Sequence, residues 1–165
     1  MMTLWAMHAM DSAFMEWQMS QYDHASRMLT TILDENLVQI ENQAHDFDRF
    51  SCLKSENLPS EFWKKTLDKS ADKDVCHRQH GLVLMRYVIE QLNENPCLQV
   101  TLFEQGHLND YSVVHYRITL LGQHQIFSQL TLTLQSVITG LGHQNPACLG
   151  KRYFLTLGRQ SWRCI

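Results

Sequence analysis

The clearest pattern in the chain is an alternation of apolar and polar residues between Tyr111 and Ile138. A period of two is typical of half-buried antiparallel strands. It predicts one strand over residues 111–121 and another over 126–138, joined by a turn at Gly122-Gln123-His124. The face expected to meet a covering layer carries Val114, Tyr116, Ile118, Leu120, Ile126, Leu130, Leu132 and Leu134. Further strands are predicted at about 98–105 and 152–163.

Before this region, apolar residues recur every three or four positions, which predicts helices. A long helix is expected from residue 11 to about 47, capped by Asp11 or Ser12. Shorter helices are expected over 61–70, capped by Ser60, and from 75 to 94, where Asn95-Pro96 ends the last one. The stripe of the long helix comprises Phe14, Trp17, Tyr22, Ala25, Leu29, Ile32, Leu33, Leu37, Ile40, Ala44 and Phe47.

Two interpretations of the long helix are open. It covers a whole sheet, or its stretch from Leu29 to Phe47 forms a coiled-coil seam with another chain. The first is favoured, because the seam is short. Helices followed by an antiparallel meander predict a single α+β domain over residues 1–165, with helices in about 11–94 and a curved sheet of about four strands in about 97–165.

Composition narrows the class of protein. A hydrophobic fraction of 44% and a charged fraction of 19% are ordinary for a globular domain. No apolar run approaches the ~20 residues of a membrane span, so no membrane partner is expected. Five cysteines without a tight spacing, in a chain without an evident export signal, favour reduced thiols and a cytoplasmic location.

Charge is distributed unevenly along the chain. Residues 1–110 hold all 17 acidic residues and nine of the 14 basic ones, whereas residues 111–165 hold five basic residues and no acid. Either the C-terminal part binds an anionic partner, or the basic sheet packs against the chain's own acidic helices. The second is favoured, and nucleic acid is not an expected partner, because five charges are too few for a basic stripe.

Few residues suggest chemistry. Cys76 and His80 would share a helix face and hold two corners of a zinc site, with His107 or Cys97 as further ligands. The chain has no CxxC or HExxH motif, so neither a metal nor a cofactor is expected. Acid–base groups are conceivable in two pairs, His107 with Asp110 and His115 with Tyr116.

Two segments suggest a family. Asn109–Tyr116 looks like a turn and strand that follow a third helix, and Gly158–Ile165 looks like a closing turn with Trp-Arg-hydrophobic-Ile. Over about residues 75–165 the chain resembles the NTF2-like superfamily, which includes SnoaL-like cyclases and ketosteroid isomerase. The resemblance implies a cone-shaped fold with a pocket at its wide end and dimers through the outer sheet face. The long first helix and the region 48–74 depart from that pattern.

Alternation assigns the two faces of the sheet different roles. The helix-facing side is the place for a pocket, although plain core packing is the favoured role of its aromatic residues. Pocket candidates are Trp63, His80, Tyr116, Tyr153 and Trp162. Interface candidates on the polar side are His115, Arg117, Thr119, Gln129, Thr131 and Thr133.

These observations favour a non-catalytic module that binds a protein or a small apolar ligand. It would act as a homodimer through the polar sheet face, or as an accessory protein of a larger assembly. The alternative is a small-molecule isomerase, cyclase or hydrolase with an acid–base pocket in an NTF2-like cone. A pocket between sheet and helices would favour the enzyme, and a filled interior would exclude it.

Overall fold

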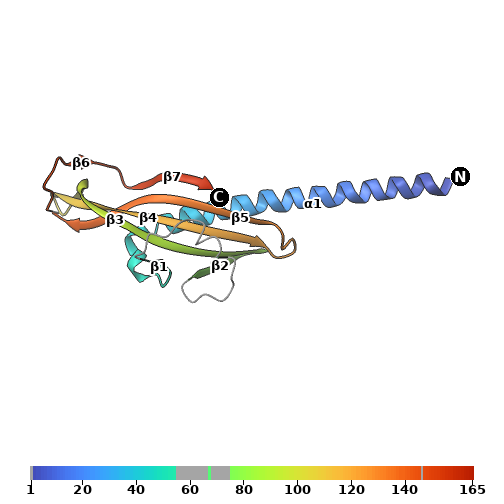
Figure 1. Cartoon of the computed structure of the whole chain (residues 1–165), viewed down its shortest axis with the longest axis horizontal. Coiled ribbons are helices and arrows are strands. Elements are labelled where there is room, and N and C mark those ends of the chain that lie inside the picture. The colour runs from blue at the N-terminus through green and yellow to red at the C-terminus, as the bar shows by residue number, and fades with distance from the viewer. Residues whose placement is uncertain (1, 55–66, 68–74, 146) are drawn as a thin grey trace.

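A computed structural model gives the fold of the chain. It describes residues 2–54, 67, 75–145 and 147–165. The described residues form a long N-terminal helix lying along one face of a large, open, mainly antiparallel sheet, so the predicted α+β class is confirmed (Figure 1). None of the helices in this part of the chain combines the length and apolarity that crossing a bilayer requires.

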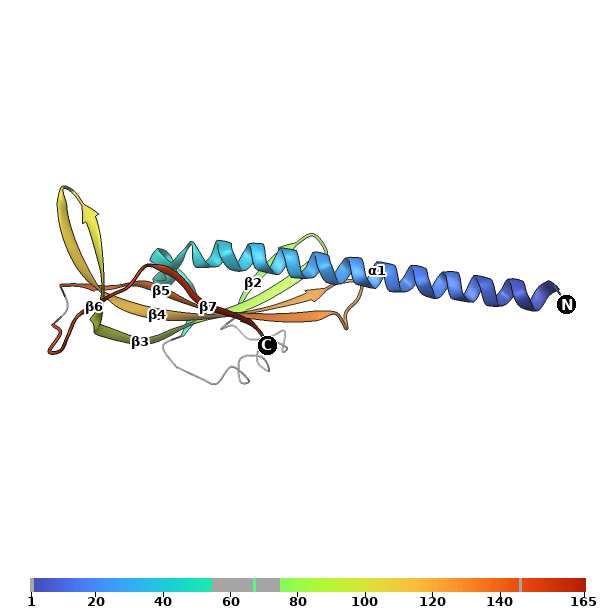
Figure 2. The ribbon, with the colours of Figure 1, turned by 90° about the horizontal axis from the view of Figure 1, so that it is seen from above.

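The long helix α1 spans Met2–Glu41 and is followed by the 3₁₀ helix η1, Ala44–Arg49. The helix therefore begins well before the predicted caps Asp11 and Ser12. With 40 residues, α1 is on the order of 60 Å long at 1.5 Å per residue. Its C-terminal half lies along the sheet, and its N-terminal half projects beyond the edge of the sheet (Figure 2).

Seven strands belong to the sheet in the described part of the chain, more than the four predicted. They are β1 (Leu53–Lys54), β2 (Cys76–His80), β3 (Val83–Glu104), β4 (His107–His124), β5 (Thr131–Gln144), β6 (Tyr153–Phe154) and β7 (Gly158–Cys164). The main path runs β1-β3-β4-β5-β7. Strands β2 and β6 join the same path through β3. The pairs β1–β3 and β3–β6 are parallel, and the other pairs are antiparallel.

The predicted helix over residues 75–94 is wrong: this stretch forms β2 and the first half of β3. Its apolar residues satisfy both periods, since Met85 and Ile89 are four apart and also lie on an alternating row with Val83 and Tyr87. All four are buried in the core, and β-branched and aromatic residues favour strands. Gly81, at φ +56°, lies between β2 and β3 and permits the tight connection of the hairpin.

Strand β3 does not end at Asn95-Pro96, as predicted for the helix. It continues to Glu104, and its register with β4 shifts between Gln91 and Glu94 and again between Asn95 and Gln99. Pro96 lies within the second shift, where its missing N–H removes no regular ladder bond. Bulges of this kind bend a strand, and the β3–β4 hairpin turns out of the line of the sheet in Figure 2.

The assignment of the sheet faces is confirmed except at Ile126, which is 67% exposed in the turn before β5. The core between α1 and the sheet combines a helix stripe with the predicted apolar face of β4 and β5; its members include Ala25, Leu29, Leu33, Leu37, Ile40, Val114, Tyr116, Ile118, Leu120, Leu130, Leu134 and Ile138. The predicted hairpin is also present, but β4 runs through Gly122-Gln123-His124, and the turn follows at residues 125–130.

The expectation of reduced thiols is wrong. Cys52 is bonded to Cys76, and Cys97 to Cys148, while Cys164 is free and exposed. The first bond ties the segment after η1 to β2, and the second ties the bulged part of β3 to the segment between β5 and β6. Both join residues far apart in sequence, so spacing alone gave no sign of them.

Candidate interaction surface

The projecting half of α1 exposes an unusual amount of apolar surface. The exposed fractions of its large side chains are 75% for Met10, 56% for Phe14, 62% for Met15, 58% for Trp17, 70% for Met19 and 46% for Tyr22. Further along the same helix, Leu29, Leu33, Leu37 and Ile40 are at most 1% exposed. Large apolar side chains therefore occur in both halves of the helix, but the sheet covers only the C-terminal half.

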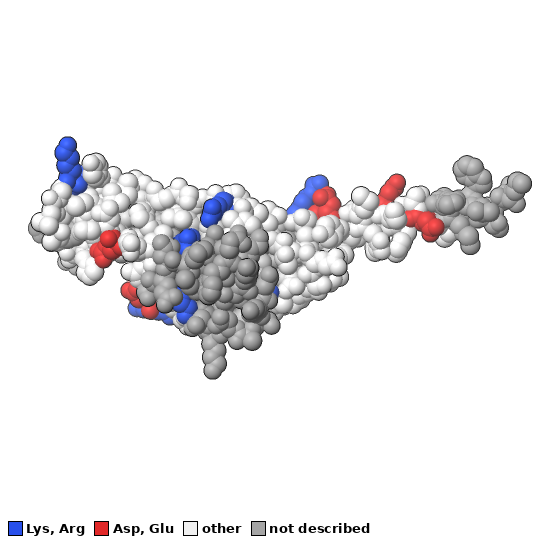
Figure 3. Space-filling view, viewed as in Figure 1, with Lys and Arg blue, Asp and Glu red and all other residues white. Residues whose placement is uncertain are grey.

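The charges of the projecting half are few and of one sign. Residues 2–22 contain Asp11 and Glu16 and no lysine or arginine. The next pair along the helix is an exposed salt bridge between Asp23 and Arg27, with 2.8 Å between Oδ2 and Nη2. Outside the grey tip, this part of the helix has a mostly uncharged surface in Figure 3. A solvated helix normally carries a charged face, and this one does not.

A groove opens where α1 leaves the sheet. Its lining comprises Trp17, Gln18, Met19, Gln21, Tyr22, Asp23, Ser26, Ile126 and Phe127. The last two residues belong to the turn between β4 and β5. The ring of Phe127 meets the ring of Tyr22 edge-on, with 5.9 Å between centroids, so the turn forms a wall beside the helix.

The buried ring of His124 holds this turn in place. Its Nδ1 accepts hydrogen bonds from the backbone N–H groups of Ile126, at 3.3 Å, and Phe127, at 3.2 Å. The ring also lies 5.3 Å from that of Phe127, centroid to centroid. The groove wall is thus fixed by the fold rather than by a partner.

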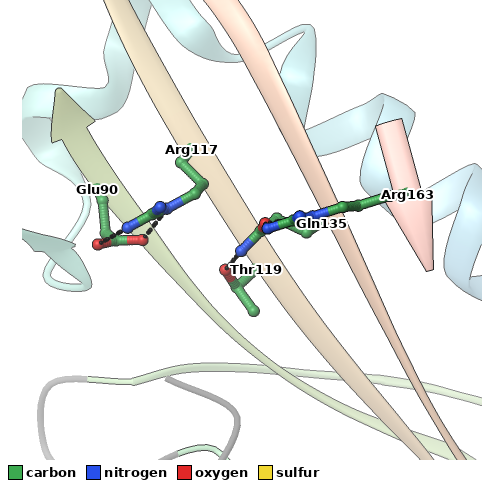
Figure 4. A network of polar contacts seen from close by, with 5 residues as sticks. All are labelled: Glu90, Arg117, Thr119, Gln135 and Arg163. Carbon is green, nitrogen blue, oxygen red and sulfur yellow. Dashed lines mark hydrogen bonds and ion pairs between the residues drawn. The ribbon is translucent and has the colours of Figure 1, made fainter. Parts of the chain in front are cut away.

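The base of α1 is anchored to the sheet by polar contacts. Glu41 accepts a hydrogen bond from Ser136 Oγ at 2.5 Å and forms a salt bridge with Arg159, whose Nη2 lies 2.9 Å from Oε2. A second arginine of the C-terminal part, Arg117, binds Glu90 with two contacts of 2.6 and 2.7 Å (Figure 4). These pairs support the interpretation that basic sheet residues neutralise the chain's own acidic residues.

The four pocket candidates that the structure describes are not brought together. Tyr116 is buried and meets Phe47 edge-on, with 5.0 Å between ring centroids. His80 pairs with Val83 at one end of β3, whereas Tyr153 pairs with Leu98, roughly 50 Å further along the strand at about 3.3 Å per residue. Trp162 is 45% exposed on β7, and Trp63 lies outside the described residues.

Of the interface candidates, several lie inside the molecule. Thr119 and Thr133 are buried, and the amide of Gln135 donates to Thr119 Oγ1 and accepts from Arg163 (Figure 4). On the same side of the sheet, Leu67 packs with Leu121. The other candidates vary: His115 is half-buried beside Thr139, while Gln129 and Thr131 are exposed at the turn and start of β5.

The residues considered for chemistry are also dispersed. Cys76 is in a disulfide, and it lies four strand residues from His80, on the order of 13 Å away. Asp110 accepts a hydrogen bond from Thr101 at 2.8 Å rather than orienting His107. Within the described residues, no three His, Cys, Asp or Glu side chains are grouped to hold a metal ion.

One polar cluster does combine residue types used in catalysis. Glu94 accepts a hydrogen bond from Ser112 Oγ and contacts His143 Nδ1 at 2.8 Å. Burial alone would raise the pKa of Glu94, but hydrogen bonds from Ser112 and His143, and the charge of His143, hold this pKa below its usual 4.5. Because Ser112 is buried and bonded to the carboxylate rather than to the imidazole, the cluster joins β3, β4 and β5 instead of activating a nucleophile.

No family model matches the chain, and no curated protein or solved structure matches it either. The resemblance to the NTF2-like superfamily therefore stays a prediction. The amino-acid sequence does not reveal the exposed surface of α1, because Phe14, Trp17 and Tyr22 fit the same helical spacing as the core residue Leu29. One feature of the sequence does indicate a binding surface there: six of the eight methionines fall within residues 1–19, and methionine is common at adaptable binding surfaces.

Proposed function

We propose that the protein is a non-catalytic interaction module that associates with further copies of itself through the projecting half of α1. The observation that carries the proposal is the exposure of six large apolar side chains on a helix whose other half buries its apolar stripe against the sheet. Exposed apolar surface of this extent marks interaction sites in globular proteins.

The amount of surface supports a protein partner. An aromatic side chain buries roughly 150–250 Å², so six half-exposed side chains offer on the order of 700 Å². A stable interface takes about 800 Å² from each partner. A second copy presents a surface of the same size and chemistry. Flexible methionines, enriched here, also suit packing against another apolar helix.

The proposal moves the interface away from the polar sheet face predicted earlier. Thr119 and Thr133 are buried in the chain itself, and the nearly buried side chain of Arg117 is held by Glu90, so they offer a second copy little free surface. We therefore propose association of copies through the helix in place of the homodimer through the sheet face. A role as an accessory protein of a larger assembly is compatible with this association.

The alternative enzyme in an NTF2-like cone has less support. The region between α1 and the sheet is occupied by packed side chains, with Phe47 and Tyr116 in direct contact. Burial, together with the charges of Asp48 and Glu94, raises the pKa of Tyr116 above 10.0, which keeps its phenol neutral. We therefore propose no reaction and no small apolar ligand for this interior.

The expected cytoplasmic location rested on reduced cysteines. Two disulfides remove that basis, because disulfides form and persist in oxidising compartments. We propose that the chain acquires its fold in such a compartment.

The self-association is tested by the molar mass in solution over a range of concentrations. A variant with Phe14→Gln, Trp17→Gln and Met19→Gln removes the exposed surface and should shift the protein to the monomer. The matched control is Phe103→Gln with Leu108→Gln, two residues each 73% exposed on the β3–β4 hairpin, which should leave the mass unchanged. A wild-type protein that stays monomeric at its highest soluble concentration would refute the proposal.

A further inference from the structure

The apolar surface of the projecting helix consists of two separate seams. The first seam is Met10, Phe14 and Trp17, and the second is Met15, Met19 and Tyr22; within each, residues are three or four apart. At 3.6 residues per turn the two seams lie roughly 140° apart around the helix axis. A single neighbouring helix covers one such seam and leaves the other in water.

The second seam continues the face that the helix turns toward the sheet. From Tyr22 the spacing leads through Ser26 to Leu29 and Leu33, both of which are buried against β4 and β5. Past the end of the sheet this face has no cover from the described part of the chain except the edge of Phe127 on Tyr22. The groove beside it, lined by Met19 and Tyr22 of this seam and bordered by Trp17 of the first, has a volume of about 960 Å³, which leaves room for side chains from another molecule.

The two seams differ in shape and chemistry. The first is an exposed aromatic ridge, in which the rings of Phe14 and Trp17 stack with 6.1 Å between their centroids. The second offers two thioethers and a tyrosine beside the turn that carries Ile126 and Phe127. Thioether sulfur packs favourably against aromatic rings, so the ridge complements the groove better than either seam complements itself.

The area also favours use of both seams at once. Three half-exposed side chains offer roughly 350 Å² per seam, less than half of the surface that one partner contributes to a stable interface. Both seams together come close to that amount. A copy that uses both seams, each in contact with a different neighbour, therefore leaves neither seam exposed to water.

We infer that each copy places the ridge of its first seam in the groove along the second seam of a neighbour, so that the chain forms assemblies of three or more copies. This inference rests on the proposed self-association and adds which surface of one copy contacts which surface of the next. The two contacting surfaces differ and face directions roughly 140° apart, so one neighbour cannot engage both of them. The contact is therefore heterologous, and repetition gives a ring or an open filament rather than a twofold dimer.

Complementation between two variants tests this geometry. The ridge variant carries Met10→Gln and Phe14→Gln, neither of which lines the groove, and the groove variant carries Met19→Gln and Tyr22→Gln, both of which do. Light scattering should find three or more copies for the wild-type chain and monomers for each variant alone. An equimolar mixture should form a heterodimer at concentrations at which each variant alone is monomeric, because one intact ridge then meets one intact groove and no further contact remains. Unchanged thermal midpoints would show that all chains are folded.

The other outcomes separate the two proposals. A wild-type dimer, or variants that remain dimers when alone, would refute the heterologous contact and leave self-association through the helix standing. A wild-type monomer would refute both. Flotation with phosphatidylcholine vesicles tests a lipid surface as the alternative occupant of the seams: binding to vesicles by a protein that stays monomeric would also refute both. The variant Phe103→Gln with Leu108→Gln should retain the wild-type mass.

Discussion

Gly122 sets how closely α1 approaches the sheet. A Cβ at this position would overlap Leu33, whose Cγ lies 2.8 Å from the ideal Cβ position, and Leu33 is fully buried in the core. The side chain of Leu33 therefore packs directly against the backbone of β4. The sequence pattern places Gly122 in a turn, but in the structure it lies in β4 and allows the helix to pack closely.

Gly122→Ala should destabilise the protein by about 1–3 kcal/mol, because an added methyl group forces a well-packed leucine out of place. Urea unfolding followed by circular dichroism measures the change. Gly106→Ala is a useful contrast: its φ of +86° predicts backbone strain, but nothing lies within 4 Å of the added Cβ. In a Leu33→Ala background, Gly122→Ala should cost less than it does in the wild-type chain if the overlap is the cause of the loss.

Because of Glu94, the free energy of unfolding should fall in acid. Its carboxylate is favoured in the folded state, since its pKa lies below the usual 4.5. The sign follows: the contribution is present above the pKa of the unfolded chain and is lost as pH falls through the lower, folded pKa. Glu94→Gln should reduce the free energy of unfolding by roughly 1–2 kcal/mol near pH 7 and by less near pH 3. An equal loss at both pH values would show that the charge is irrelevant.

At the scale of elements, α1 has two halves with one apolar character and different surroundings. The half that includes Leu29 and Ile40 is held by the sheet, and the half that includes Met15 and Met19 is not. Length explains the division, because the helix extends beyond the ends of the strands that it covers. The interpretation that the helix covers the sheet is thus confirmed for its C-terminal half, where Leu29 to Phe47 pack on the sheet rather than on another chain. Pairing with another chain is a proposal for the half before Leu29.

The anchor at Glu41 should matter for docking of the helix on the sheet. Glu41→Ala removes the acceptor for Ser136 and the partner of Arg159, so we expect a loss of about 1–3 kcal/mol in the free energy of unfolding. Asp23→Ala removes the exposed pair with Arg27 and should cost less than about 0.5 kcal/mol. Equal effects of the two changes would contradict an anchoring role for Glu41.

At the scale of the whole molecule, the two disulfides fasten long connections to the sheet. They close intervals of 24 and 51 residues. Cross-links of this length stabilise a chain by about 3–4 kcal/mol each, mainly by restricting the unfolded state.

Labelling with a thiol reagent should therefore detect one reactive thiol out of five in the native protein, at Cys164, and five after reduction and unfolding. Reduction alone should lower the thermal midpoint by at least several degrees. Cys164→Ser serves as the control, because it should abolish native labelling and leave the midpoint unchanged. Three or more reactive thiols in the native chain would contradict the assigned bonds.

The sequence by itself determined the α+β class, the paired strands over Tyr111–Ile138 and which of their faces meets the helix. These properties depend on local periodicity, and alternation around Tyr116 and Ile118 has only one structural interpretation. It did not determine whether residues 75–94 form a helix or strands, because Met85 and Ile89 fit both periods and the choice depends on pairing with β4.

The disulfide pairs and the burial of only part of α1 depend on the tertiary structure. Leu33 and Met19 are both apolar and lie on one face of the helix, but burial depends on where the sheet ends. That limit is set by residues about a hundred positions away in the chain, whose effect no local pattern around Met19 records.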